Sequence, residues 1–380
     1  MTQKTPYFSH IAGRLPRGCQ LCVQGSKLVL FVTGLCSRKC YYCPLSDVKR
    51  NKDDIWANEW KIKETNDIIT EAKLCNAQGA GLTGGDPILR INRTISLIKL
   101  LKNNFGKEFH IHLYTPTNLV TEEKLKKLYK AGLDEIRFHP DIENSKDWSK
   151  IELAKKFNWS LGVEIPVIPG KAKETKRLID YLSRINIDFL NLNELEISDT
   201  NANKLLEKGF KTKDNISYAI KGSEQLALKL LKYAENKIRN IHYCTAKLKD
   251  KVQLANRIKR RAKNIARDYD IINLDGILKR GAIYLEELKP GFGYRKKLES
   301  LNKNSIKKFN SKLNKIKKQL TDRFHIPDNL INIDEDKLRI LIDLKILHHL
   351  KEQIKSKGLI PAVVEEYPTH DQLELSVDFL

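Results

Sequence analysis

The sequence predicts an α/β fold in which a parallel sheet is followed by a smaller α+β part. Short apolar runs alternate with helical segments of 10–15 residues through roughly the first 200 residues. Such alternation favours parallel strands joined by right-handed crossovers. Beyond that point the alternation stops, and segments rich in lysine and arginine follow.

Six strand–helix repeats are expected in order along the chain. The strands are expected at 28–33, 80–83, 108–114, 134–138, 160–165 and 189–192. The helices that follow the first five are expected at 62–76, 94–105, 122–131, 147–157 and 173–184. Gly132 follows the third of these helices, and glycine is typical of the position just after a helix because it adopts left-handed backbone easily.

Four segments are expected along the chain, namely an N-terminal extension (1–27), a core (28–200), a helical extension (201–250) and a basic α+β appendage (251–380). Residues 203–240 are expected to be mostly helical. Two helices at 247–267 and 303–323 contain nine and eight Lys or Arg, each with one Asp. The appendage is expected to include a hairpin at 269–287 and a strand–helix–strand unit at 336–364.

Composition narrows the class of protein. The formal net charge of +22 favours a polyanionic partner, although a chain rich in Lys, Asn and Ile can owe this charge to genome composition. Neither an apolar run long enough to span a membrane nor a signal peptide is found. Seven cysteines, an odd number, argue against a disulfide-stabilised secreted protein. We therefore expect a cytoplasmic enzyme without a membrane partner.

Three cysteines follow the first strand within eight residues, at C-x3-C-x2-C spacing: Cys36, Cys40 and Cys43. Three thiolates can hold three corners of an iron–sulfur cube and leave one iron open to a ligand. Zinc is the alternative, but zinc sites usually have four protein ligands in paired C-x2-C units. The spacing therefore favours an iron–sulfur cluster.

The second motif is Gly84-Gly85-Asp86-Pro87, at the end of the second predicted strand. Glycines there let the backbone approach a ligand closely, and the carboxylate can take an ammonium group. Together with Tyr42 just before the last cysteine, the two motifs resemble the signature of the radical SAM superfamily. Asp86 stands where that superfamily more often has Glu.

The resemblance covers about the first 200 residues and implies several properties. It implies a (β/α)6 partial TIM-like barrel and a [4Fe–4S] cluster that cleaves S-adenosylmethionine to a 5′-deoxyadenosyl radical. It also implies an electron donor of ferredoxin or flavodoxin type. The closest resemblance is to an archaeal group related to pyruvate formate-lyase activating enzymes, which does not identify the substrate.

Active sites of such barrels lie at the carboxyl ends of the strands, and those ends are polar here. The resemblance makes His139 and Glu194 candidate catalytic residues. The residues expected to contact the cofactor are Tyr42, Gly84, Gly85, Asp86, Thr115, Arg137, His139, Pro166 and Asn193. An ordinary hydrogen-bonded residue on the barrel rim is the alternative for each.

Three further cysteines form a second set. Cys19 and Cys22 make a C-x2-C pair before the first strand, and Cys244 follows His242 far downstream. We expect Cys19, Cys22 and Cys244 to hold zinc or an auxiliary iron–sulfur cluster. The alternative is three unrelated thiols. Cys75 lies among apolar helical residues and is expected to be a core thiol.

Three functions follow from these features. The first is hydrogen abstraction from a macromolecular substrate such as tRNA or another RNA, favoured by the charge and the two basic helices. The second is activation of a glycyl-radical enzyme, or modification of another protein or peptide. The third, from another class, is a non-catalytic protein that binds zinc and nucleic acid.

Overall fold

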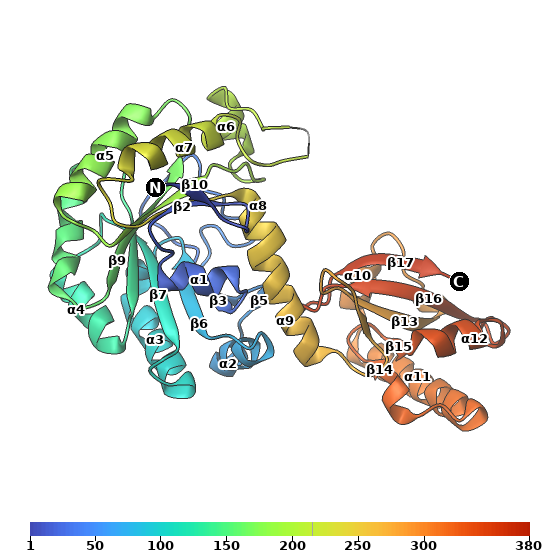
Figure 1. Ribbon diagram of the computed structural model, residues 1–380. Helices are drawn as coiled ribbons and strands as arrows, with labels where there is room; N and C mark the ends of the chain where they lie inside the picture. Colours follow the sequence, from blue (N-terminus) through green and yellow to red (C-terminus); the bar gives the residue numbers. More distant parts are fainter. Residues whose placement is uncertain (215) are drawn as a thin grey trace. The chain divides into compact units, whose positions relative to one another are not determined.

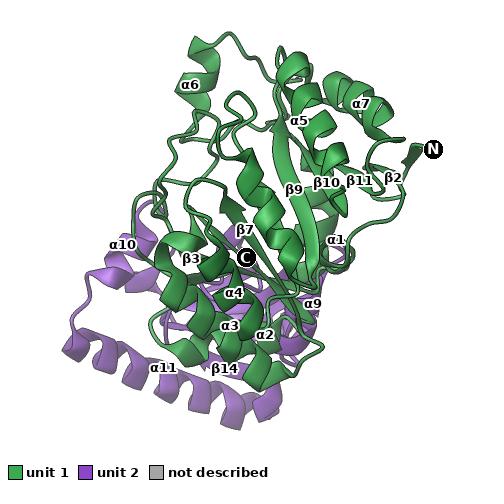
Figure 2. Ribbon diagram, turned by 90° about the vertical axis from the view of Figure 1, so that its left-hand side faces the viewer, with its two compact units in different colours: residues 1–257 green, residues 258–380 purple. Residues whose placement is uncertain are grey.

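The computed structural model describes residues 1–214 and 216–380, and Figure 1 shows its ribbon. Contacts divide the chain into two compact units, residues 1–257 and 258–380, which Figure 2 colours separately. Each unit has a hydrophobic core of its own. The boundary falls inside helix α9 (Ala255–Ile265).

A single sheet organises unit 1. In the described residues its order is β1-β2-β11-β10-β9-β8-β7-β6-β3-β4-β5. The central strands, from β11 to β3 in that order, all run parallel. Their bounds are Lys27–Thr33 (β3), Gly79–Gly84 (β6), His110–Pro116 (β7), Glu135–His139 (β8), Ser160–Val167 (β9), Phe189–Glu194 (β10) and Ile241–Cys244 (β11).

The outer strands of this sheet are short and antiparallel to their neighbours. β2 pairs with β11, and β4 pairs with β3. Their bounds are Gln3–Lys4 (β1), His10–Ala12 (β2), Trp56–Ala57 (β4) and Trp60–Lys61 (β5). The predicted α/β fold is therefore confirmed, with one parallel strand, β11, beyond the six predicted.

Helices cover the outside of this curved sheet, and α1 lies on its inner side (Figure 1). The helices of unit 1 are Arg17–Val23 (α1), Thr65–Leu74 (α2), Ile91–Phe105 (α3), Glu122–Ala131 (α4), Ala172–Arg184 (α5), Ala202–Glu207 (α6), Ser223–Ala234 (α7) and Ala246–Leu248 (α8). Short 3-10 turns cover Pro87–Arg90 (η1) and Trp148–Lys156 (η2), and a π-helix, Lys249–Leu254 (η3), joins α8 to α9.

The helix predicted at 147–157 is a 3-10 helix instead. Its buried residues are Trp148, Ile151 and Ala154. These are spaced by three residues, which matches the three residues per turn of a 3-10 helix better than the 3.6 of an α-helix. Residues 203–240, expected to be mostly helical, contain less helix than that, because α6 ends at Glu207 and α7 covers Ser223–Ala234.

Unit 2 is built on a second, antiparallel sheet with the order β14-β15-β13-β16-β17, and β12 pairs with β13. The strands are Ile271–Ile272 (β12), Leu278–Leu285 (β13), Ile331–Asp334 (β14), Arg339–Ile342 (β15), Leu359–Glu366 (β16) and Glu374–Phe379 (β17). The helices are Tyr294–Glu299 (α10), Lys303–Phe324 (α11) and Leu344–Lys355 (α12), with 3-10 turns at Glu286–Leu288 (η4) and Asp328–Leu330 (η5). The predicted hairpin and strand–helix–strand unit are both present.

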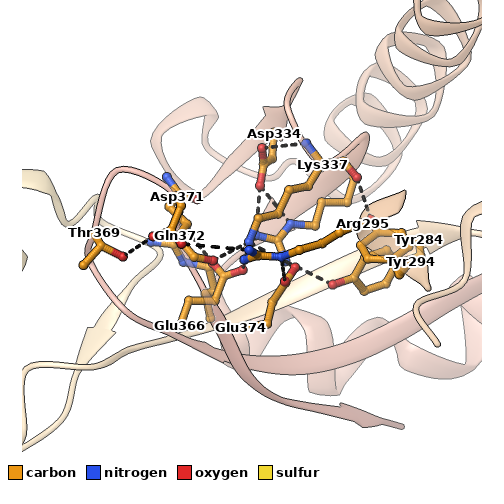
Figure 3. A network of polar contacts seen from close by, with 12 residues as sticks. Tyr284, Tyr294, Arg295, Asp334, Lys337, Glu366, Thr369, Asp371, Gln372 and Glu374 are labelled. Carbon is orange, nitrogen blue, oxygen red and sulfur yellow. Dashed lines mark hydrogen bonds and ion pairs between the residues drawn. The ribbon is translucent and has the colours of Figure 1, made fainter. Parts of the chain in front are cut away.

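A network of buried charges crosses the sheet of unit 2, as Figure 3 shows. Glu366 on β16 accepts from Lys337 at 2.7 Å and from Arg339 at 2.5 Å. Arg339 also pairs with Asp334 at 2.9 Å and donates to the Tyr284 hydroxyl at 3.0 Å. Because each buried charge has an opposite partner, the network fits a structural role.

The sequence predicts no membrane-spanning segment, and the hydropathy of the helices is consistent with this prediction. Across the described chain, every helix is either too short or too polar to cross a bilayer.

Candidate functional site

The cysteine loop, residues 34–55, follows β3 and is closed on itself at its base. The Gly34 amide donates to the Lys52 carbonyl at 2.7 Å, and the Asn51 amide donates to Gly34 at 3.0 Å. The thiols of Cys36, Cys40 and Cys43 are free and half-buried. The loop therefore presents the three predicted ligands from a fixed base.

Asp53 connects the base of the cysteine loop to β3 and to α3. Its carboxylate accepts from Thr33 at 2.7 Å, from Arg90 at 2.9 Å and from Arg93 at 2.6 Å. Hydrogen bonds from Arg93 first, and from Thr33 and Arg90, hold the pKa of Asp53 well below its usual range. The carboxylate thus stays ionised and keeps the loop anchored at neutral pH.

His139, at the end of β8, anchors the other side of the cysteine loop. Its Nδ1 lies 2.8 Å from the Glu164 carbonyl oxygen, and its Nε2 lies 3.1 Å from the Tyr42 hydroxyl. A carbonyl can only accept, so Nδ1 carries the proton and Nε2 accepts from Tyr42. Burial lowers the pKa of His139 to about 4, so the ring is neutral. Arg38 adds a second anchor by donating to the His139 carbonyl at 2.8 Å.

The glycine pair packs directly against the start of the cysteine loop. The Gly85 amide donates to the Thr33 carbonyl and the Asp86 amide to the Leu35 carbonyl, both at 2.8 Å. A Cβ on Gly85 would lie 2.2 Å from the Leu35 oxygen, and one on Gly84 would lie 2.3 Å from the Thr33 oxygen. Gly84 also has φ +138°, a value that side chains rarely allow. Only glycine lets these two backbones meet.

Asp86 is fully buried, and one of its oxygens is committed to the protein. Oδ1 accepts from the Ile88 amide at 3.0 Å and from the Thr115 hydroxyl at 2.9 Å. Oδ2 has no hydrogen-bond partner among the described residues. Burial raises the pKa of Asp86, against the opposing effect of Thr115 and the Ile88 amide. The Asp86 side chain is thus held inside the protein, behind the glycine pair.

The inner face of the sheet carries a polar network around Arg137 and Glu164. Arg137 donates to Glu135 at 2.6 Å, to Glu164 at 2.9 Å and to the Tyr114 hydroxyl at 3.0 Å. Burial works to raise the pKa of Glu164, but Arg137 and two side-chain amides outweigh it and lower that pKa. Arg137 is 2% exposed and its donors are taken within the protein. It therefore holds Glu164 in place as an anion.

Two asparagines of β10 complete this network. Asn191 donates to Glu164 Oε2 and Asn193 to Oε1, both at 2.8 Å. Glu194, at the end of β10, instead accepts from the Ala246 amide at 2.9 Å, at the start of α8. Glu164 is thus held by three donors from two neighbouring strands.

One cavity of about 920 Å³ joins these parts. Every site residue predicted from the sequence lines it except Asp86, whose side chain turns into the protein. The lining includes Cys36, Cys40, Cys43, Tyr42, Gly84, Gly85, Thr115, Arg137, His139, Pro166, Asn193, Glu194, Cys19, Cys22 and Cys244. The roles of these residues stay predictions, but the fold brings them to one place.

Several lining residues were not predicted as site residues. Among them are Glu164, His112, Asn191 and His242. A signal for them exists in the sequence, because polar residues recur at every second position of these strands, as in His110-Ile111-His112 and Asn191-Leu192-Asn193. A period of two puts such residues on one face of a strand. This face is the inside of the sheet.

The donor chemistry at the mouth of the cavity fits an iron–sulfur cluster. Cys36, Cys40 and Cys43 offer three thiols, and the loop contains neither a fourth cysteine nor a histidine. Among the described residues, no three His, Cys, Asp or Glu side chains lie close enough together to hold a metal ion as they stand. The thiols would therefore turn toward the cluster when it binds.

Comparisons with known proteins give a matching family and a relative for this chain. The family model described as "Radical SAM superfamily" matches residues 30–192. A Methanocaldococcus jannaschii protein, provisionally named a glycyl-radical enzyme activating enzyme, is 41% identical over 97% of this chain and 94% of its own.

Solved structures with a similar fold are more distant. Streptococcus suis SuiB bound to S-adenosylmethionine is 14% identical over 58% of this chain and 50% of its own, with a TM-score of 0.40. Escherichia coli coproporphyrinogen III oxidase is 10% identical over 92% of this chain and 94% of its own, with a TM-score of 0.32.

Proposed function

The chain belongs to the radical SAM superfamily, and we propose that it activates a glycyl-radical enzyme by removing a hydrogen atom from a glycine of that partner. One observation carries this proposal: the relative provisionally named for this activity is 41% identical over 97% of the chain. Similarity of this extent includes both units and the complete cysteine loop. Because the chain is a radical SAM enzyme, the third function considered above, a non-catalytic protein that binds zinc and nucleic acid, is wrong.

The residues of the cavity have separate roles in this proposal. Cys36, Cys40 and Cys43 would hold the [4Fe–4S] cluster, and Gly84 and Gly85 would lie beside the amino group of S-adenosylmethionine. The Asp86 side chain, predicted to contact the cofactor, would instead hold the turn behind them through the Ile88 amide. When bound, these cofactors supply a 5′-deoxyadenosyl radical that takes the hydrogen atom. An electron donor of ferredoxin or flavodoxin type would serve the cluster.

The protein's own contribution is position and exclusion of water. Two hydrogen bonds hold the cysteine loop against His139 at the end of β8. The Tyr42 hydroxyl lies 3.1 Å from His139 Nε2, and Arg38 donates to the His139 carbonyl at 2.8 Å. Glu164 would face a ligand with a fixed negative charge, because Arg137 and two asparagines orient both of its oxygens. Preorganised charges of this kind cost no reorganisation during reaction. The cavity of about 920 Å³ leaves room for a short peptide beside the cofactor.

An RNA substrate, the first function considered from the sequence, has less support than the alternative. The relative is named for action on a protein. The basic helix α11 does present lysines to solvent, but Lys312 pairs with Glu287 at 2.6 Å and Lys317 with Asp328 at 3.8 Å. Surface pairs of this type are typical of a solvated helix face.

The proposal is tested by following the abstracted hydrogen. The reconstituted protein is incubated without oxygen with reductant, S-adenosylmethionine and a candidate glycyl-radical enzyme from the same genome, labelled with Cα-deuterated glycine. We expect deuterium in 5′-deoxyadenosine and a glycyl-radical signal by electron paramagnetic resonance. Unlabelled 5′-deoxyadenosine, together with loss of a modified tRNA nucleoside in a deletion strain, would instead favour an RNA substrate.

Replacing Gly85 by alanine is expected to loosen the cysteine loop and to lower the iron content. The new Cβ would lie 2.2 Å from the Leu35 oxygen, so the loop backbone must move. Overpacking of this kind costs about 1–3 kcal/mol. Iron and acid-labile sulfide per chain, measured with the thermal midpoint, check this result.

Gly291→Ala is the matched control, because a Cβ at Gly291 has nothing within 4 Å. This variant should keep the iron content and thermal midpoint of the natural chain. Equal iron content in Gly85→Ala and Gly291→Ala would contradict the packing argument.

A further inference from the structure

Helix α1 brings two cysteines to the inner face of the sheet. The Gly18 amide donates to Glu135 at 3.1 Å, and a Cβ on Gly18 would lie 2.4 Å from an Arg137 nitrogen, so the helix lies directly on the polar network. Cys19 and Cys22 are three residues apart on this helix, which places them on the same side. Cys19 is 5% exposed and Cys22 is partly buried, and both line the cavity.

Strand β11 brings a third cysteine and a histidine to the same cavity. His242 and Cys244 are two residues apart on this strand and therefore share a face. The parallel register pairs His242 with Asn191 and Cys244 with Asn193. Asn191 also donates to the Cys19 sulfur at 3.3 Å, so this one residue connects α1 to β11.

Packing at the end of α1 supports the same proximity. Val23, next to Cys22, shares a small apolar cluster with Cys244, Leu248 and Val252. Asn256 holds this end of the helix by donating to the Val23 carbonyl at 2.7 Å. Two segments more than 200 residues apart in the sequence thus place their thiols on one wall.

His242 is the observation that points to a ligand. Its side chain is 1% exposed, and neither ring nitrogen has a hydrogen-bond partner in the part of the chain that the structure describes. A buried polar group without a partner costs about 1–3 kcal/mol. Burial lowers the pKa of His242 to about 4, so the ring is in the neutral form that binds metals.

We propose that Cys19, Cys22, Cys244 and His242 form a second metal centre, separate from Cys36, Cys40 and Cys43. Three thiolates and one imidazole are a known donor set for tetrahedral zinc, and thiolates with histidine also hold iron–sulfur clusters. A metal would satisfy one nitrogen of His242. It would also give three buried thiols a common role.

Cations next to each thiol fit such a centre. Burial raises the pKa of Cys19 to about 12, and Arg137 is the largest effect that lowers it. Arg137, and then Lys27, oppose the raised pKa of Cys22, and Lys249 opposes that of Cys244. Arg137 and Lys249 would balance part of the charge on the thiolates that metal binding creates. In the described residues, neither set of cysteines has its side chains arranged around a metal position. Both sets would therefore need side-chain rotation when a metal binds.

The test removes the first metal site and asks what metal remains. The full chain carrying Cys36→Ala, Cys40→Ala and Cys43→Ala is purified anaerobically, and zinc, iron and acid-labile sulfide are measured per chain. We expect roughly one bound centre to remain. Zinc alone would identify a zinc site, and iron with sulfide would identify a cluster. A metal-free chain would overturn the proposal.

A fourth substitution locates the remaining metal. Cys19→Ser or Cys244→Ser, added to the triple variant, should remove at least nine-tenths of it. Cys75→Ser is the matched control, because Cys75 is also buried but donates to Glu71 at 3.2 Å, away from the cavity. Equal metal loss with Cys75→Ser would overturn the assignment.

Cobalt spectroscopy keeps the proposal testable if a serine variant fails to fold. The triple variant is stripped of metal and titrated with Co²⁺. Intense thiolate-to-cobalt charge transfer, together with tetrahedral d–d bands, is expected, and His242→Ala should change the d–d bands while keeping the charge transfer. Absence of charge transfer in the folded triple variant would overturn the proposal.

Discussion

Replacing Cys36, Cys40 and Cys43 by alanine is expected to reduce 5′-deoxyadenosine formation to the level found without enzyme. Three thiolates are needed to hold three irons of the cluster and leave the fourth open. The loop supplies these three and no others. Anaerobic reconstitution with reductant and S-adenosylmethionine, followed by chromatography of the nucleoside product, measures the effect. Retained product formation in the triple variant would refute the assignment of these cysteines.

The control for this experiment is Cys75→Ala. Cys75 is 1% exposed at the end of α2, and its thiol donates to Glu71, so it tests the loss of a buried thiol without touching the loop. We expect this variant to form product at a rate close to that of the natural chain. Metal retained at the second site of the triple variant would show in addition that its lost activity does not come from unfolding.

The local motifs could be predicted from the sequence because their geometry is short-range. Cys36, Cys40 and Cys43 share one loop, and the glycine pair follows β6 directly. The need for glycine at Gly85 could also be anticipated, although its cause, the Leu35 carbonyl 2.2 Å from the position of a Cβ, comes from the fold. Spacing along the chain was therefore enough to predict which loop carries the three thiols.

Features that depend on the pairing of distant segments could not be predicted in the same way. Strand β11 has four residues, Ile241–Cys244, and is a strand because β10 and β2 lie on either side of it. Glu164 is central because Arg137 and Asn191 reach it from neighbouring strands. Such contacts need the register of the sheet, which residue spacing does not give.

The 3-10 helix η2 shows a different limit. Helical periodicity was correctly recognised at 147–157, but the spacing of Trp148, Ile151 and Ala154 is three and not 3.6. The two helix types differ by only about 0.6 residue per turn, so a segment of nine residues is too short for its sequence pattern to separate them. Burial of all three side chains against the core decides between them.

Arg339→Met is expected to destabilise unit 2 by about 3–5 kcal/mol, because it removes the buried positive charge that lies between Glu366 and Asp334. Arg339 is 0% exposed and pairs with Glu366, itself 0% exposed, at 2.5 Å and with Asp334 at 2.9 Å. Burial works to lower the pKa of Arg339, but Glu366 first, then Tyr284 and Asp334, raise it well above its usual value. Arg339 is therefore charged at neutral pH.

Arg295→Met is the matched control, since it makes the same substitution at the rim of the same network. The Arg295 side chain is 45% exposed, and its pairs with Asp371 and Glu374 are long, at 3.9 and 3.7 Å. Exposed pairs contribute about 0–1 kcal/mol, so this variant should stay close to the natural chain. Equal losses in the two variants would show that burial does not decide the cost.

The two units can be followed separately in this experiment. All four tryptophans lie in unit 1, at Trp56, Trp60, Trp148 and Trp159, so tryptophan fluorescence reports that unit alone. Hydrogen exchange of the amides of β13, β15 and β16 reports unit 2. In Arg339→Met we expect these amides to exchange about 10²- to 10⁴-fold faster, as 3–5 kcal/mol implies. The fluorescence transition should stay unchanged if the network stabilises unit 2 alone, and an equal shift of both signals would mean that the units unfold together.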